Sequence, residues 1–193
     1  SYEIVLENGS STSELKYVKH EITQGKPKIN SLPATYVNSE DEAETLEITL
    51  NDNIAGLTVI LSYTIYNNYN AITRCTKFIN SNSNSEKINL RKALSFSVDL
   101  DHSNFDLLQL SGAWAREKHI YKRALVPGIQ SIDSKKGISS HQQNPFVALL
   151  GKNADEDHGE VYGFSLVYSG NFLAEVEVDQ FNFTRVQMGI NPF

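Results

Sequence analysis

The chain has 193 residues, of which 40% are hydrophobic and 21% charged, a composition typical of a folded globular protein. Its formal net charge of −6 argues against nucleic-acid binding, because phosphates attract a basic surface, and against binding to an anionic membrane. Cys75 is the single cysteine, so no disulfide can form within the chain, and a cytoplasmic location is favoured. No apolar run reaches the roughly 20 residues that a membrane-spanning helix needs.

Apolar residues recur at every second position along most of the chain, which predicts strands rather than helices. The pattern is visible in residues 45–50, 57–66, 91–100, 161–169, 172–179 and 183–190. In the fifth of these segments Ala174, Val176 and Val178 alternate with acidic residues, so one face meets the core and the other meets water. Many strands at short spacing predict one all-β domain, an antiparallel β-sandwich.

Turn signals separate the strands. Asn8-Gly9 and Ser169-Gly170-Asn171 each lie between two strand candidates and predict hairpin turns, and Asn67-Asn68 predicts another turn. Residues 80–85, NSNSNS, predict a polar loop. The acidic run EDEAE at residues 40–44 predicts a solvated loop or the entrance to a strand.

The search for catalytic and metal-binding motifs is mostly negative. The five histidines never occur at HxH or HxxxH spacing, and no glycine-rich loop joins a strand to a helix. DEDHGE at residues 155–160 faintly resembles a calcium loop but lacks ligands, so a solvated hairpin loop is favoured. Asp99 and Asp101 could in principle form a glycosidase pair, yet they lie on one short segment and we expect surface carboxylates. The residues predict neither a metal nor a cofactor.

Trp114 is the only tryptophan, and two roles are open to it. An exposed tryptophan would stack on a sugar ring, whereas a tryptophan at the edge of the core would fill volume. Because Trp is usually well buried, the core edge is the favoured position.

Several long segments follow one another in an order known from a single family. They are LPATYV at 32–37 with DEAETLEITL at 41–50, FDLLQLSGAWAREKHIY at 105–121, PGIQSIDSKKGISSHQQNPFVALL at 127–150, GEVYGFSLVYSGNFLAEVEVDQF at 159–181 and TRVQMGINPF at 184–193. Together they cover nearly the whole chain. They resemble the amino-terminal β-domain of glycoside hydrolase family 36 α-galactosidases, most of all the bacterial members.

The resemblance implies a fold and a parent activity. The implied fold is all-β, an antiparallel β-supersandwich like that of galactose mutarotases, here incomplete at its amino-terminal strands. In the family this domain precedes a (β/α)₈ barrel, which carries both catalytic aspartates, and a small carboxy-terminal β-domain. The implied reaction is retaining hydrolysis of terminal α-D-galactosides such as melibiose and raffinose, with no cofactor.

The chain departs from the family in length. A barrel takes about 250 residues, and neither aspartate motif of the barrel occurs in the sequence. We therefore expect residues 1–193 to be a single domain, a fragment of the amino-terminal domain with both ends cut. It should contain no catalytic residue and be inactive alone. Its expected roles are scaffolding, packing against its own catalytic barrel and assembly of a homo-oligomer. A stand-alone carbohydrate-binding β-sandwich is the alternative.

Residues 139–146, SSHQQNPF, concentrate hydrogen-bonding side chains in one segment. A buried polar group without a partner costs about 1–3 kcal/mol, so any buried member needs one. We expect the four central polar residues either to hold an internal corner or to fix a loop that faces the barrel; these are His141, Gln142, Gln143 and Asn144. Pro145 should then lead into a strand over residues 146–150.

Overall fold

The computed structural model describes residues 1–30, 32–82 and 87–191. It divides into two compact units, a first unit of Tyr2–Ser95 and a second unit formed mainly by Phe96–Phe193. The expected single domain over residues 1–193 stays a prediction.

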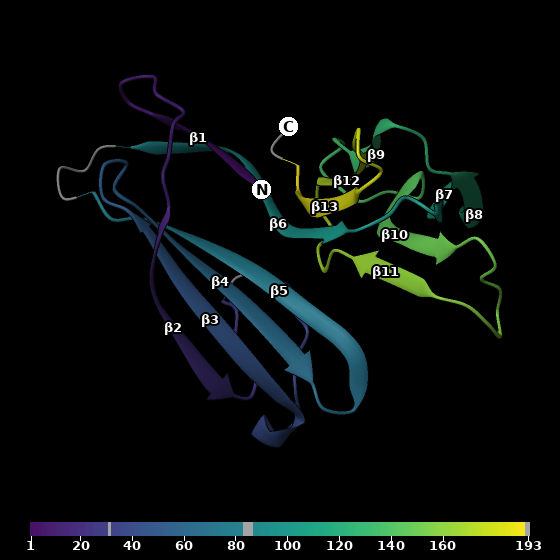
Figure 1. The fold of residues 1–193 in the computed structure, drawn as a ribbon, viewed down its shortest axis with the longest axis horizontal. Helices are drawn as coiled ribbons and strands as arrows, with labels where there is room; N and C mark the ends of the chain where they lie inside the picture. The colour runs from purple at the N-terminus through teal and green to yellow at the C-terminus, as the bar shows by residue number, and fades with distance from the viewer. Residues whose placement is uncertain (31, 83–86, 192–193) are drawn as a thin grey trace. The chain divides into compact units, whose positions relative to one another are not determined.

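The first unit is built on an antiparallel meander of four strands, which lie in chain order across the sheet (Figure 1). They are β2 (Lys16–Gln24), β3 (Ala43–Asp52), β4 (Leu57–Tyr66) and β5 (Tyr69–Asn80). A short 3₁₀ helix, η1 (Glu40–Glu42), leads into β3, so the acidic run is a strand entrance. A separate strand, β1 (Tyr2–Leu6), pairs antiparallel with the first part of β6 (Ile88–Leu100).

The two ends of the meander bury different kinds of side chain, apolar ones near β1 and threonine hydroxyls at the other end. Near β1, the side chains of Ile4, Leu57 and Val59 form a buried cluster. At the other end, the hydroxyls of Thr45 and Thr64 are buried 2.8 Å apart on neighbouring strands, and Thr45 Oγ1 donates to the Gly25 carbonyl at 2.7 Å. Both of these buried hydroxyls therefore have a hydrogen-bond partner, which avoids the free-energy cost of burying a polar group without one.

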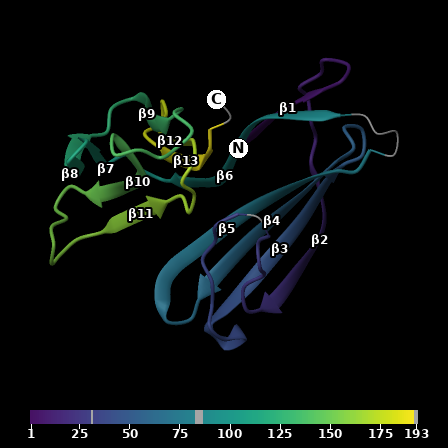
Figure 2. The same ribbon diagram turned by 180° about the vertical axis from the view of Figure 1, so that it is seen from behind.

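The second unit is an antiparallel β-sandwich (Figure 2). One sheet contains the last part of β6, then β13 (Thr184–Ile190), β12 (Phe172–Val178) and β9 (Gly128–Ser134). The other contains β11 (Val161–Ser165), β10 (Gln143–Gly151), β7 (Phe105–Ala113) and β8 (Arg116–Ala124). Leu107 and Leu149 from the second sheet share one buried cluster with Phe172 and Val176 from the first. The predicted all-β fold is confirmed, and so is the alternating face of β12, on which Ala174, Val176 and Val178 are buried.

Only some of the predicted turns join paired strands. The turn at Asn67-Asn68 closes the β4–β5 hairpin, as predicted. The hairpins predicted at Asn8-Gly9 and Ser169-Gly170-Asn171 are wrong: β1 pairs with β6 rather than β2, and β11 pairs with β10 while β12 pairs with β9 and β13. The chain does turn at Gly9, whose N–H donates to the Leu6 carbonyl at 2.9 Å. Turn residues determine where the chain reverses its direction. Burial of the apolar side chains determines which strands pair with each other. Part of the NSNSNS loop, residues 83–85, lies outside the described residues.

Candidate functional site

Gln143 closes a hydrogen-bonded cluster where β10 begins beside β7. Ser111 Oγ donates to Gln143 Oε1 at 2.8 Å, and Gln109 Nε2 donates to Ser111 Oγ at 2.8 Å. The same amide nitrogen lies 3.5 Å from Gln143 Oε1. One residue earlier, the main-chain carbonyl of Gln142 accepts the N–H of Gly112 at 3.2 Å. These bonds tie the start of β10 to β7.

The other members of the segment are placed differently. The Gln142 side chain is exposed and accepts a hydrogen bond from the Lys136 amino group. His141 is exposed, and Asn144 is half-buried within β10. The four residues thus do not converge on one cavity, and their role as an interface stays a prediction.

Pro145 does not precede the strand, as the sequence suggested, but lies inside it. β10 begins at Gln143, and its register with β7 shifts between Gln143 and Val147. Proline has no N–H to donate to a ladder, so it is tolerated at such an irregularity. Its carbonyl still accepts the N–H of Leu166 at 3.0 Å.

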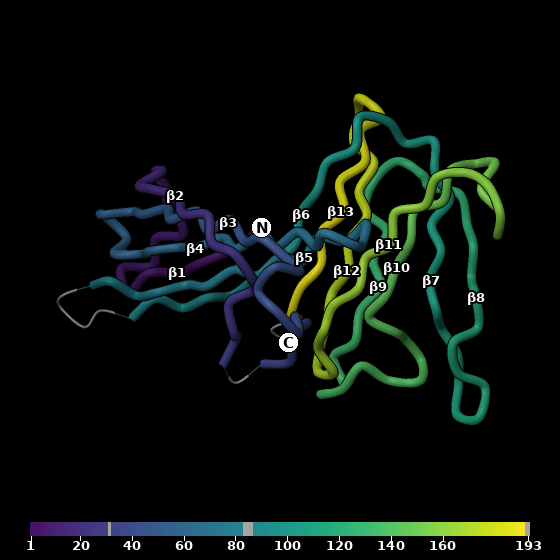
Figure 3. The backbone as a smooth tube through the Cα atoms, turned by 90° about the horizontal axis from the view of Figure 1, so that it is seen from below, coloured from purple at the N-terminus to yellow at the C-terminus, as the bar shows by residue number. Residues whose placement is uncertain are grey.

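Trp114 is 83% exposed, so the favoured position at the edge of the core is wrong. It follows the last residue of β7 and stands on the turn into β8, which lies at the outer edge of its sheet (Figure 3). Ala115, next in the chain, has a φ of 61°, a left-handed conformation typical of tight turns. Ile120 and Tyr121 of β8 are also exposed.

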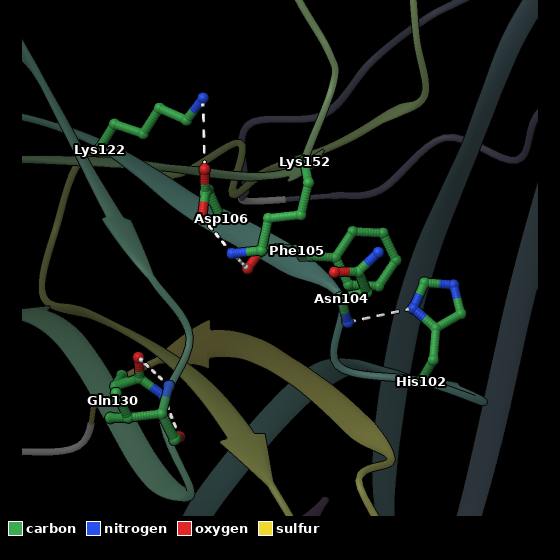
Figure 4. Close-up of polar contacts among 8 residues, drawn as sticks. His102, Asn104, Phe105, Asp106, Lys122, Gln130 and Lys152 are labelled. Carbon is green, nitrogen blue, oxygen red and sulfur yellow. Dashed lines mark hydrogen bonds and ion pairs between the residues drawn. The ribbon is translucent and has the colours of Figure 1, made fainter.

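Asp106 is held by two lysines from different strands (Figure 4). Its carboxylate lies 2.5 Å from Lys152 Nζ and 3.3 Å from Lys122 Nζ, and Lys152 also donates to the Phe105 carbonyl at 3.0 Å. The hydrogen bond from Lys152 is the main reason that the pKa of Asp106 is lowered, and Lys122 adds to the effect. A carboxylate held ionised in this way ties β7, β8 and the end of β10 together and is a poor general acid.

The carboxylates considered for glycosidase chemistry have structural partners or lie in water. Asp99 accepts two hydrogen bonds from Arg185, at 2.6 and 3.2 Å, and hydrogen bonding to this guanidinium is the main cause that lowers the pKa of Asp99. Asp101 is exposed. In the 155–160 loop, Asp155 Oδ1 accepts the main-chain N–H groups of Asp157 and His158 at 2.8 and 2.7 Å, as in an ordinary turn. That loop joins the paired strands β10 and β11, as the hairpin prediction required.

A hollow of about 580 Å³ lies in the first unit, lined in part by Leu6, Glu7, Ile54 and Lys87. Asp52 lies at its wall and is 4% exposed. Its carboxylate accepts the main-chain N–H groups of Glu14, Ile54 and Ala55 at 2.7, 2.9 and 2.9 Å. Burial acts to raise its pKa, but these three donors outweigh burial and the pKa is lowered. Its oxygens are therefore engaged with the backbone.

Sequence reasoning missed the anchoring roles of Asp52 and Asp106. Their partners are 38 and 46 residues away in the longest cases, so no local spacing could have revealed them. Across residues 1–30, 32–82 and 87–191, no three His, Cys, Asp or Glu side chains gather as metal ligands would. None of the helices in these ranges is long and apolar enough to cross a membrane.

Comparison with known proteins places these features in a family. The model of the Glycosyl hydrolase family 36 N-terminal domain matches residues 1–193. The chain is 56% identical to alpha-galactosidase AgaA of Geobacillus stearothermophilus over 193 residues, which are 100% of the chain and 26% of that relative. It is 39% identical to alpha-galactosidase 1 of Pediococcus pentosaceus over 186 residues, which are 96% of the chain and 25% of the relative.

Comparison with solved structures gives the same family assignment. The crystal structure of the Geobacillus AgaA enzyme superposes with a TM-score of 0.96 at 57% identity, covering 100% of this chain and 26% of that one. The alpha-galactosidase of Lactobacillus brevis gives a TM-score of 0.94 at 44% identity, covering 99% of this chain and 25% of that one. The chain belongs to the glycoside hydrolase family 36 amino-terminal domains. It spans about a quarter of the length of these relatives.

Proposed function

We propose that the chain is the non-catalytic part of an α-galactosidase and supports a catalytic barrel that lies outside residues 1–193. One observation carries this proposal: the relatives are whole alpha-galactosidases, and the chain corresponds to about a quarter of each. The carboxylates give further support. Asp52, Asp99 and Asp106 are each engaged with main-chain or cationic donors, so none is arranged as a nucleophile or an acid in a retaining pair.

The substrate class follows from the same relatives. Crystal structures of variants of the Geobacillus AgaA enzyme contain stachyose and raffinose. We propose that the parent protein hydrolyses terminal α-D-galactosides of this kind, melibiose and raffinose among them, with retention of configuration and without a cofactor. A cytoplasmic location, favoured by the single cysteine, belongs to the same proposal.

Packing against the barrel and assembly of a homo-oligomer are the roles that we propose for the domain itself. The β7–β8 hairpin supports the first role. It presents Trp114, Ile120 and Tyr121 to solvent, and large exposed apolar side chains on one hairpin are typical of a contact surface.

A stand-alone carbohydrate-binding module is the second candidate, because the exposed indole of Trp114 could stack on a sugar ring. Calorimetric titration of the 193-residue chain with melibiose distinguishes the scaffold function from the carbohydrate-binding function. The scaffold proposal predicts no saturable heat at millimolar sugar. Saturable binding to the chain, abolished in Trp114→Ala and unchanged in an Ile120→Ala control, would instead support the module.

A further inference from the structure

β8 is an uncovered sheet edge. It is the outer strand of the sheet that contains β7, β10 and β11 (Figure 3), and all nine of its residues are exposed. Across residues 1–30, 32–82 and 87–191, β7 is the only strand that pairs with it. Such an edge presents a row of main-chain N–H and C=O groups, to which an extended segment of another chain can add as a further strand.

The edge is basic, although the whole chain carries a formal net charge of −6. Its sequence, REKHIYKRA, contains four Lys or Arg residues, one histidine and a single acidic residue, Glu117. The Glu117 carboxylate accepts the main-chain N–H of Ala115 at 3.3 Å, so it is engaged within the hairpin. On β7, Asp106 lies 3.3 Å from Lys122 but is shared with Lys152, which leaves a surplus of positive charge. β8 therefore attracts a partner of opposite charge.

Residues 119–124 form the regular part of this edge. They pair with β7 without interruption, whereas the register shifts between Ser111 and Ala113. Lys118, which precedes them, has a φ of 57°, a left-handed conformation that departs from strand geometry. Irregularities of this kind limit how far an edge can be extended by pairing. An added strand is therefore limited to residues 119–124.

The side chains of this regular part define a complementary sequence. Lys122 and Ile120 project from one face of the sheet, and Arg123 and Tyr121 project from the other. Ile120 and Tyr121 are 69% and 56% exposed, so each face offers a cation beside an open apolar side chain. A segment that adds antiparallel meets Arg123 and Lys122 first, and then Tyr121 and Ile120. Two acidic residues followed by two apolar residues would oppose them, and both kinds of cross-strand pair are stabilising.

We propose that β8 is a docking edge for an extended acidic segment of a separate protein, which adds as an antiparallel strand along residues 119–124. A peptide is favoured over an acidic polysaccharide, because a peptide strand matches the spacing of the main-chain donors and acceptors along the edge as well as its charge. The inference is independent of the proposed function. The proposed contact with the barrel uses side chains that project from the hairpin, whereas an added strand binds through the main chain at its edge.

Fluorescence polarisation tests the docking edge. The probe is a labelled peptide with the central sequence Glu-Glu-Val-Val, and its control carries N-methyl groups on these central amides but keeps every side chain and charge. The unmodified peptide should bind both the 193-residue chain and the product of the complete reading frame. The methylated peptide should bind at least about tenfold more weakly, because it cannot donate main-chain hydrogen bonds to the edge.

Three results of this titration would overturn the proposal. Equal binding of the two peptides, or equally effective binding of polygalacturonate at the same concentration of charge, would show that charge alone is recognised. Binding to the 193-residue chain but not to the complete product would show that the edge is covered within the parent. Absence of binding by the unmodified peptide to either protein would contradict a docking edge directly.

Charge reversal locates the binding site on β8. Arg123→Glu should raise the dissociation constant of the peptide about fivefold or more, because an attractive cross-strand pair becomes repulsive. Lys28→Glu makes the same change of charge at an exposed position of the first unit and serves as control. Circular dichroism checks that both variants are folded. Hydrogen exchange gives a second readout, in which bound peptide should slow exchange in β8 but not in β2, another exposed edge strand. Equal dissociation constants for the two variants, or protection of β2 in place of β8, would place the peptide elsewhere and refute the proposal.

Discussion

At Asp52 the chain buries a carboxylate and surrounds it with main-chain donors rather than with a cation. Three N–H groups from Glu14, Ile54 and Ala55 point at its oxygens, and two of them belong to the turn between β3 and β4. The lowered pKa has a consequence for stability. A carboxyl whose pKa is lower in the folded than in the unfolded state stabilises the fold above the unfolded value of about 3.9, and this contribution is lost as the pH falls through the folded pKa.

We therefore expect Asp52→Asn to lower the free energy of unfolding at about pH 7 by about 1.5–3 kcal/mol, the range for hydrogen bonds to a charged group. The difference from the unchanged chain should shrink as the pH falls below about 4, because the carboxyl group of the unfolded chain then takes up a proton while the native carboxylate, with its lowered pKa, remains ionised until the pH falls further. Urea unfolding at a series of pH values measures both effects. Asp157→Asn, at an exposed position, serves as control and should change stability by less than about 0.5 kcal/mol. A constant difference at every pH would show that ionisation of Asp52 is not involved.

Among the structural elements, the β7–β8 hairpin depends on one close approach. A Cβ atom at Gly112 would overlap the carbonyl oxygen of Arg116 on the opposite strand. The N–H of Gly112 also donates to Gln142, so the glycine joins the hairpin to the start of β10. Side chains added where the backbone is this close force the strands apart.

Gly112→Ala should thus destabilise the chain by about 1–3 kcal/mol, the usual cost of overpacking. Gly163→Ala on β11 is the matched control. Its added methyl group would meet the Phe146 ring at 3.5 Å, which is an ordinary contact. The melting temperatures of the two variants, measured by thermal unfolding under the same conditions, are then compared. Equal melting temperatures would mean that the hairpin opens at little cost and that Gly112 is not a required residue.

The strands and turns also show which features of the fold can be predicted from the sequence. Period-two alternation predicted strands and buried faces correctly, as at Ala174, Val176 and Val178, because strand geometry itself imposes that period. Strand partners were not predictable at Asn8-Gly9, because β1 pairs with a strand more than 80 residues away. Trp114 was misplaced for a related reason: its exposure depends on a tight turn that removes it from the core, and residue type alone does not reveal that turn.

At the scale of the whole molecule, the polar clusters are structural. The Gln109–Ser111–Gln143 cluster joins β7 to β10, and the Asp106 cluster joins β7, β8 and β10, so both stabilise one sheet of the second unit. The family was recognisable from the sequence through long contiguous segments. The side-chain contacts were not, because the residues that meet are brought together only by strand pairing.

We propose that residues 1–193 support α-galactoside hydrolysis by a larger protein without performing it. The most direct measurement is the release of p-nitrophenol from p-nitrophenyl α-D-galactoside, assayed for the 193-residue chain and for the complete reading frame that contains it. We expect rapid release of p-nitrophenol by the complete product and no release above background by the 193-residue chain at equal molar concentration. Hydrolysis by the chain alone, or none by the complete product, would contradict it.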